Sequence, residues 1–248
     1  MRTRTSVFLA LAVVAASACD TTSPAGDAGS ALAPRTNAAS IALAFPDNAR
    51  PYGTSTVDWS VNWWRWALSA PTAVNPILDL TGADCGVGQQ GPVWYLASII
   101  TGSGTRTCTI PHGKALGINL SGILNDYPCP DPNFHPAPGE SLQEFLTAGA
   151  KGVVDLVDGL TLTVDGQSVE GLFARRNTSR LIHFTGDSSL QTSIDGCITG
   201  TEQSAVVDGY FIILKPLAGG SHSITFTASD THGVMTSVTW NLVVESEG

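Results

Sequence analysis

The fold class is decided by residues 210–244, which read YFIILKPLAGGSHSITFTASDTHGVMTSVTWNLVV. In segments 222–228 and 238–244 apolar residues alternate with polar ones, which predicts two strands that each bury one face. Segment 210–214 is apolar at every position, which predicts a strand covered on both faces. We expect these three strands to form a meander within a mostly β domain, a single β-sandwich.

A helix is predicted over residues 57–68, upstream of these strands. The hydroxyl side chains of residues 54–56 can cap its first turn, and Pro71 ends it. At about 100° per residue, three tryptophans fall on one narrow face, namely Trp59, Trp63 and Trp66. This Trp-rich face is the expected cover for the strand at 210–214. Trp64 lies on the other side, so the helix should be covered on two sides.

Further strands are predicted between this helix and the C-terminal segment. A buried strand is expected within 91–100, and a strand at 105–110 is expected to return as 114–120 after a turn. A strand at 160–164 is followed by Asp165-Gly166, which marks a tight hairpin turn. The segment 173–184 is also expected to be extended, and one further short helix is predicted over 141–154.

The N-terminus has the layout of a secretory signal peptide. Arg2 and Arg4 precede an apolar run at 7–16 that is too short to span a bilayer. Residues 16–19, Ala-Ser-Ala-Cys, resemble the lipobox of bacterial lipoproteins. This resemblance implies that the thiol of Cys19 carries a diacylglycerol.

The chain is therefore expected to divide into three parts. Residues 1–18 form the signal peptide, and residues 19–50 form the lipidated cysteine and a flexible tether rich in Ala, Ser, Thr and Gly. Residues 51–248 form the β-sandwich domain. The expected location is the periplasmic or cell-surface face of the cell envelope, with the lipid anchor holding the protein to the membrane.

The remaining cysteines form an even set, which is typical of disulfides in an oxidising compartment. We favour a bridge between Cys85 and Cys108, which leaves Cys129 for Cys197. Zinc is the alternative, but structural zinc sites normally contain C-x-x-C spacing, which is absent here. No metal and no cofactor are expected.

Composition limits the classes of partner. The formal net charge is −9, and removal of the signal peptide takes away Arg2 and Arg4 but no acidic residue. An acidic chain is a poor partner for nucleic acid, which is therefore not expected as a ligand. A glycan or a protein remains as the possible partner, besides the membrane.

Two resemblances cover the domain. Segment 214–233 resembles the closing strands of bacterial immunoglobulin-like modules. The patterns WxxxWWxW at 59–66, DxTGxxCxxGQxGPVW at 79–94 and RxCxxPxGKAL at 106–116 are similar to those of a family of uncharacterised exported bacterial proteins. That resemblance implies a shared fold and disulfide, and it implies no activity.

Two groups of residues are candidates for ligand binding. On the helix, the polar stripe of Asp58, Asn62 and Arg65 beside Trp64 could line a cleft, because Arg can hold a carboxylate and Trp can stack on a ring. The alternative is a solvated helix face. In the following loop, Asp79 and Asp84 offer the paired carboxylates that glycoside hydrolysis needs, or they form ordinary Asx turns.

Three functions follow from these observations. The first is a non-enzymatic envelope lipoprotein that binds a glycan, a peptide or a protein partner. The second is a hydrolase or lyase acting on polysaccharide, and the third is a purely structural lipoprotein. No catalytic residue is assigned, because the chain contains no nucleophile elbow, P-loop or dinucleotide fingerprint.

Overall fold

The computed structural model describes residues 42–100 and 102–248, and in this part of the chain it is mostly β. Within these described residues, ten strands form two five-stranded sheets, called sheet A and sheet B below. The mostly β fold predicted from the alternating pattern is confirmed. The predicted signal peptide, Cys19 and most of the tether lie outside the described residues.

Sheet A has the strand order β1-β3-β8-β6, and β7 also pairs with β8. Its strands are β1 (Val93–Leu96), β3 (Ala115–Tyr127), β6 (Arg176–Thr178), β7 (Ile182–Thr185) and β8 (Glu202–Leu214). β1 runs parallel to β3, whereas β3, β6 and β7 are antiparallel to β8. Ala44 bridges to Leu214, so contacts with the sheet begin within the segment assigned to the tether.

Sheet B has the strand order β2-β10-β9-β4-β5. Its strands are β2 (Gly102–Ile110), β4 (Val157–Val164), β5 (Gln167–Ser168), β9 (Gly220–Asp230) and β10 (Met235–Val244). The hairpin predicted at Asp165-Gly166 joins β4 to β5. Both turn residues have positive φ, 50° and 77°, as the tight turns that match strand twist require.

The main core lies between the two sheets. Ile118 and Ile212 of sheet A share one buried cluster with Phe226 and Trp240 of sheet B. The outer face of β8 is buried as well, since Phe211 and Ile213 pack in a second cluster with the tryptophans of the first helix. This arrangement accounts for the uniformly apolar segment 210–214.

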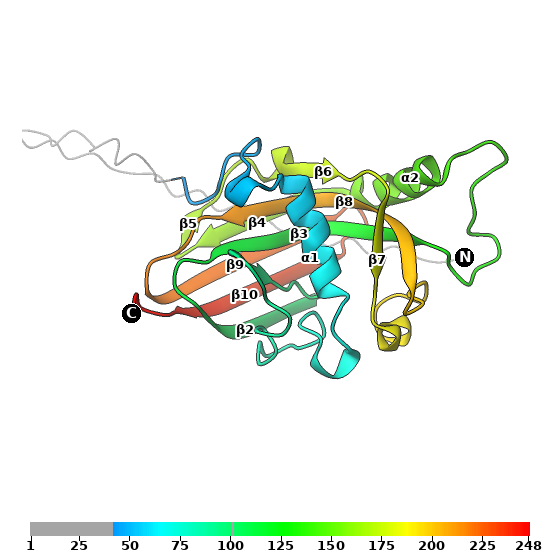
Figure 1. Ribbon diagram of the computed structural model, residues 1–248. Coiled ribbons are helices and arrows are strands. Elements are labelled where there is room, and N and C mark those ends of the chain that lie inside the picture. The colour runs from blue at the N-terminus through cyan, green and yellow to red at the C-terminus, as the bar shows by residue number, and fades with distance from the viewer. Residues whose placement is uncertain (1–41, 101) are drawn as a thin grey trace, which may run out of the picture. The chain divides into compact units, whose positions relative to one another are not determined.

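The first helix, α1 (Thr56–Ala67), crosses the outer face of sheet A over β3 and β8 (Figure 1). The Ser55 side chain accepts a hydrogen bond from the backbone N–H of Asp58, which caps the helix. Trp59, Trp63 and Trp66 are buried against the sheet, as the helical spacing predicts.

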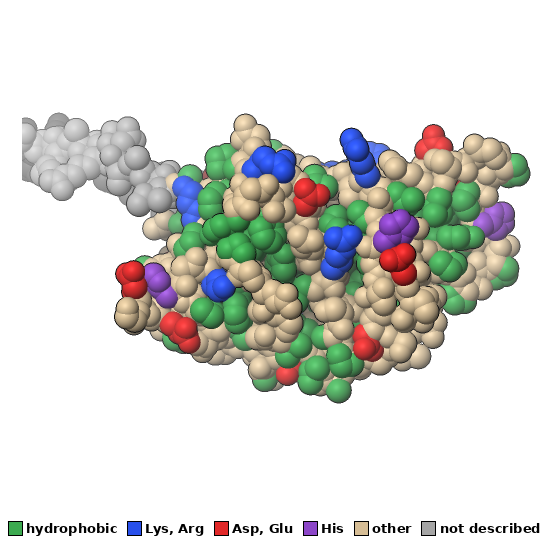
Figure 2. Space-filling model, viewed as in Figure 1, with side chains coloured by type: hydrophobic (Ala, Val, Ile, Leu, Met, Phe, Trp, Pro, Cys, Tyr) green, Lys and Arg blue, Asp and Glu red, His purple; other side chains and the backbone are tan. Residues whose placement is uncertain are grey.

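On the face shown in Figure 2, charged side chains are sparse and lie apart from one another.

The second helix, α2 (Leu142–Val154), packs on β3 and β8. Ser141 and Glu144 form a capping box at its start. Four short 3₁₀ helices complete the elements of residues 42–100 and 102–248: η1 (Pro51–Gly53), η2 (Thr72–Val74), η3 (Leu172–Arg175) and η4 (Ser188–Thr192). No helix in this part of the chain is long and apolar enough to cross a membrane.

Two predicted strand pairings are wrong. The segment 114–120 does not return beside 105–110, because β2 belongs to sheet B and β3 to sheet A. The last three strands do not form a meander either, since β8 pairs with β3 while β9 and β10 form a hairpin in the other sheet. In both cases the intervening turn carries the chain from one sheet to the other. An alternating apolar pattern gives the buried face of a strand, but not the sheet that the strand joins.

Two disulfides close the domain, and they join the pairs favoured from the sequence. Cys85 and Cys108 tie the loop after α1 to β2, with their Cα atoms 6.0 Å apart. Cys129 and Cys197 tie the end of β3 to the loop before β8. Each bridge restricts the unfolded chain and contributes on the order of 2–4 kcal/mol.

Candidate functional site

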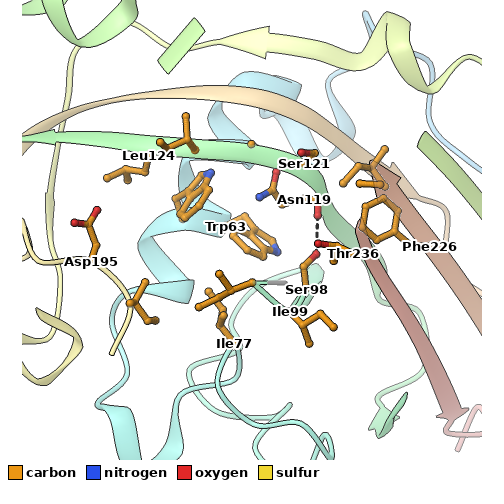
Figure 3. A pocket seen from close by; sticks show the side chains of 17 residues that line it. Trp63, Ile77, Ser98, Ile99, Asn119, Ser121, Leu124, Asp195, Phe226 and Thr236 are labelled. Carbon is orange, nitrogen blue, oxygen red and sulfur yellow. Dashed lines mark hydrogen bonds between the residues drawn. The ribbon is translucent and has the colours of Figure 1, made fainter. Parts of the chain in front are cut away.

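A cavity of about 360 Å³ lies beside β3, at the edge of sheet A (Figure 3). We call it the edge pocket. It is lined by Trp63, Trp64, Ile77, residues 98–100, residues 119–124, Ile194, Asp195, Phe226, Ala228 and Thr236. The lining is mostly apolar, with a few polar groups, which is the composition typical of ligand sites.

The pocket exists because β1 is short. β1 covers the edge of β3 only from Ala115 to Ile118, and the chain then turns away towards β2 in sheet B. Two hydrogen bonds fix the chain where it leaves the edge of β3. The carbonyl oxygen of Ala97 accepts from Arg106 Nη1 (2.8 Å) and from Trp240 Nε1 (3.2 Å). The edge of β3 beyond Ile118 is thereby left beside open space.

Polar groups stand at defined places in this apolar wall. The hydroxyl of Ser98 donates to the carbonyl oxygen of Asn119 (2.8 Å), and the side chain of Asn119 points into the pocket (Figure 3). Trp64 has a buried indole N–H without a hydrogen-bond partner among the described residues. A buried donor without a partner costs free energy. Because this nitrogen is closed off from solvent, it is not counted among the polar groups open to a ligand.

A carboxylate pair stands at one end of the edge pocket. Asp195 lines the pocket, and its carboxylate lies within 4.8 Å of that of Asp126. Asp126 is only 2% exposed and accepts a hydrogen bond from Gln203 Nε2 (3.1 Å). Burial, and then the negative charge of Asp195, raise the pKa of Asp126 to about 7. Cys197 is also nearby, but its sulfur is in a disulfide and cannot serve as a thiolate ligand for a metal.

The polar stripe on α1 has structural roles. Asp58 accepts a hydrogen bond from the hydroxyl of Ser55 (2.6 Å) in the first turn of the helix. Arg65 donates from Nη2 to the carbonyl oxygen of His183 (2.9 Å) in β7 and reaches Asn62 Oδ1 (3.5 Å). Asp58 and Arg65 do line a hollow against residues 178–182, which is separate from the edge pocket.

The loop containing Asp79 and Asp84 is stabilised by hydrogen bonds among its own residues. One carboxylate oxygen of Asp79 accepts from the backbone N–H and the hydroxyl of Thr81, and the other accepts from the backbone N–H of Asp84 (2.9 Å). Burial would raise the pKa of Asp79, but these hydrogen bonds and the charge of Arg106 lower it. Asp79 therefore behaves as an Asx-turn residue, and neither carboxylate lines the edge pocket.

No protein-family model, curated protein or solved structure matches this chain. Of the six residues nominated from the sequence as ligand-binding candidates, Trp64 lines the edge pocket. No direct signal in the sequence points to Ser98, Asn119 or Asp195, because these residues meet only after β1 and β2 separate into different sheets. One feature of the sequence is consistent with this separation. Glycines at 102 and 104 follow the strand predicted within 91–100, and glycine commonly marks a bend at the end of a strand.

Proposed function

We propose that this protein is an exported, lipid-anchored binding protein of the bacterial cell envelope that holds its ligand in the edge pocket. The observation that carries the proposal is a mostly apolar pocket of about 360 Å³ beside an uncovered strand edge. Ligand sites commonly have roughly 300–1,000 Å³, an apolar lining and a few polar groups that orient the ligand.

The edge pocket fits an apolar ligand better than a bare glycan. Trp63 is buried and Trp64 is partly buried by neighbouring residues, so neither ring is fully open for stacking on a sugar. Ile99, Phe226 and Ala228 offer apolar contacts to a ligand in the pocket. A ligand with an apolar body matches these groups.

The cellular address rests on the N-terminal sequence. The apolar run at 7–16 and Cys19 favour export and lipid attachment. Two disulfides in the folded domain support an oxidising compartment.

A polysaccharide hydrolase is the second candidate, and the carboxylate pair Asp126 and Asp195 is the observation in its favour. Retaining glycosidases hold two carboxyl groups about 5 Å apart, and one of them has a raised pKa. Asp126, however, is 2% exposed and does not line the edge pocket, whereas a general acid must come within hydrogen-bond reach of the substrate. We therefore prefer binding over hydrolysis.

The test compares two variants on arrays of bacterial polysaccharides and synthetic peptides. The chain carries Cys19→Ser so that it can be handled without detergent, which would compete for an apolar pocket. Ile100 is 56% exposed at the edge pocket, and Leu80 is 64% exposed on another loop. Ile100→Asp should abolish the array binding seen with the parent chain, and Leu80→Asp should retain it. Equal binding by both variants would show that the ligand does not use this pocket.

A further inference from the structure

The strand β3 has a long edge without a strand partner. From Ser121 to Tyr127 it pairs with β8 on one side. On its other side, β1 pairs only with residues 115–118, and no other strand of residues 42–100 and 102–248 pairs with β3. Alternate residues of such an edge present backbone N–H and C=O groups that can bind another strand.

The edge pocket straddles the plane of sheet A at this edge. Its wall includes six consecutive residues of β3, from Asn119 to Leu124. From Ser121 to Leu124, beyond the register shift between Asn119 and Ser121, successive side chains point to opposite faces. A cavity that touches all four of these residues lies beside the strand edge rather than over one face.

The two remaining walls lie on opposite sides of that plane. On one side stand Trp63 and Trp64 of α1, and on the other stand Phe226 and Ala228 of β9 in the facing sheet. A strand placed in the pocket would send alternate side chains towards these two walls. Six residues at about 3.3 Å each give a slot roughly 20 Å long, which suits one short extended segment.

The charge of the pocket indicates the polarity of the occupant. Asp195 is its one ionisable lining residue, it forms no salt bridge with a described residue, and it stands beside Asp126 near the end of β3. A cationic side chain or amine at that end of the occupant would complement this carboxylate.

We propose that the edge pocket binds an extended peptide segment of a partner protein, which adds to β3 as a strand, with alternating apolar side chains and a Lys or Arg beside Asp195. This inference rests on the proposed function, because it names the ligand class of the same pocket. Strand addition draws affinity from main-chain hydrogen bonds and specificity from the pockets for alternate side chains.

A second copy of the chain fits the slot poorly. Residues 119–124 of β3 lie between α1 on one side and β9 on the other, so this part of the edge is recessed. The same edge of another copy would be recessed in the same way, so the two edges could not meet. A free peptide segment has no such walls.

The experiment selects linear seven-residue peptides from a phage-displayed library on the full chain carrying Cys19→Ser. Selected peptides are synthesised with a fluorescent label and measured by anisotropy. Each peptide is also made in two N-methylated forms. One form is methylated at the odd-numbered backbone nitrogens and the other at the even-numbered ones, and we call these two sets the two phases. N-methylation removes the N–H donors and leaves the side chains unchanged, so at least one phase should bind tenfold or more weakly.

Two protein variants complete the design. Asp195→Asn should weaken peptides that carry a terminal Lys or Arg about tenfold and should not affect versions with an uncharged residue there. Asp84→Asn, a carboxylate outside the pocket, is the matched control and should have no effect.

The outcomes separate the two proposals. Unchanged binding of both N-methylated forms, with binding still lost in Ile100→Asp, overturns strand addition and leaves a pocket that recognises side chains. Two results would overturn the peptide as occupant. The first is that no peptide is selected, and the second is that the chain assembles into dimers that Ile100→Asp dissociates. Ligand binding that is insensitive to Ile100→Asp overturns the proposed function as well.

Discussion

Gly122 of β3 lies directly opposite Gly209 of β8, and the two backbones approach so closely that neither position has room for a side chain. A Cβ built on Gly209 would stand 2.6 Å from the Cα atom of Gly122 and 2.6 Å from the carbonyl oxygen of Ser121. The pairing of β3 with β8 also shifts register between Asn119 and Ser121. The close approach and the register shift together shape β3 where it lines the edge pocket.

Gly209→Ala is expected to destabilise the domain by about 1–3 kcal/mol, because the added methyl group meets backbone atoms that cannot move aside without separating the strands. Urea unfolding followed by tryptophan fluorescence measures the change. Gly152→Ala in α2 is the control, since a Cβ there meets nothing within 4 Å and alanine favours a helix. A Gly209→Ala protein as stable as the control would mean that β3 and β8 are further apart.

Trp63→Ala is expected to cost about 3–5 kcal/mol. Trp63 is 2% exposed between α1 and sheet A, and its indole N–H donates to the carbonyl oxygen of Leu96 (3.1 Å). Leu80→Ala, at a side chain that is 64% exposed, should change the free energy of unfolding by less than about 0.5 kcal/mol. If the two variants were equally stable, the Trp-rich face of α1 would not be part of the core.

Local elements of the fold could be predicted from the sequence. The spacing of Trp59, Trp63 and Trp66 predicts the helix and its buried face, and Asp165-Gly166 predicts the hairpin. These features depend on neighbours along the chain. The pairing of β2 with β10 and of β3 with β8 joins residues about a hundred positions apart, and the choice depends on how two sheets share one core. An apolar alternation gives the buried face of a strand but not its partner.

The candidate site was harder to predict for the same reason. Trp64 was nominated because it lies beside the polar stripe of α1 and its ring can stack on a ligand, and it does line the pocket. The other walls come from the segment after β1, from β3, from β9 and from the loop before β8. Asp58 and Asp79 were nominated as polar and acidic candidates. In the structure the carboxylate of Asp58 accepts from the Ser55 hydroxyl in the first turn of α1, and that of Asp79 closes a turn.

Arg106→Lys is expected to cost about 2–4 kcal/mol, because a buried guanidinium holds three carbonyl oxygens that a lysine cannot reach together. Arg106 is 3% exposed and donates to Pro76 (2.7 Å), Ile77 (2.8 Å) and Ala97 (2.8 Å). Burial lowers its pKa to about 10, so the side chain stays charged at neutral pH. Arg180→Lys, at an exposed position, is the control for the same substitution. Equal unfolding midpoints would refute the role of Arg106 as the anchor of the segment that opens the edge pocket.

Cys19→Ser is expected to release the protein from membranes. The thiol of Cys19 is the proposed site of lipid attachment, and a hydroxyl in its place cannot form the thioether. Fractionation of cells that express each form, followed by immunoblotting, measures the share of protein in the membrane pellet. Ser17→Ala is the control, because it keeps both the cysteine and a small residue before it. Retention of the Cys19→Ser protein in the pellet would argue against the lipid anchor.

Asp126→Asn is expected to stabilise the domain at neutral pH and to have little effect in acid. Burial, and then the charge of Asp195, raise the pKa of Asp126 to about 7 in the folded protein, against an ordinary value of 3.8. At pH values between these two pKa values, the carboxyl group is therefore protonated in the folded state and ionised in the unfolded chain. The contribution of Asp126 to stability is fully present below about pH 4 and is lost as the pH rises to about 7, a change of up to roughly 4 kcal/mol.

Asparagine mimics the protonated carboxyl and keeps an acceptor for Gln203 Nε2. The gap in the free energy of unfolding between Asp126→Asn and the parent chain should therefore widen in favour of the variant from about pH 4 to about pH 8. Urea titrations across that range measure it. Asp131→Asn, at an exposed carboxylate, is the control for the same substitution. Parallel profiles for Asp126→Asn and the parent chain would mean that the pKa of Asp126 is the same in the folded and the unfolded chain, so that burial does not raise it.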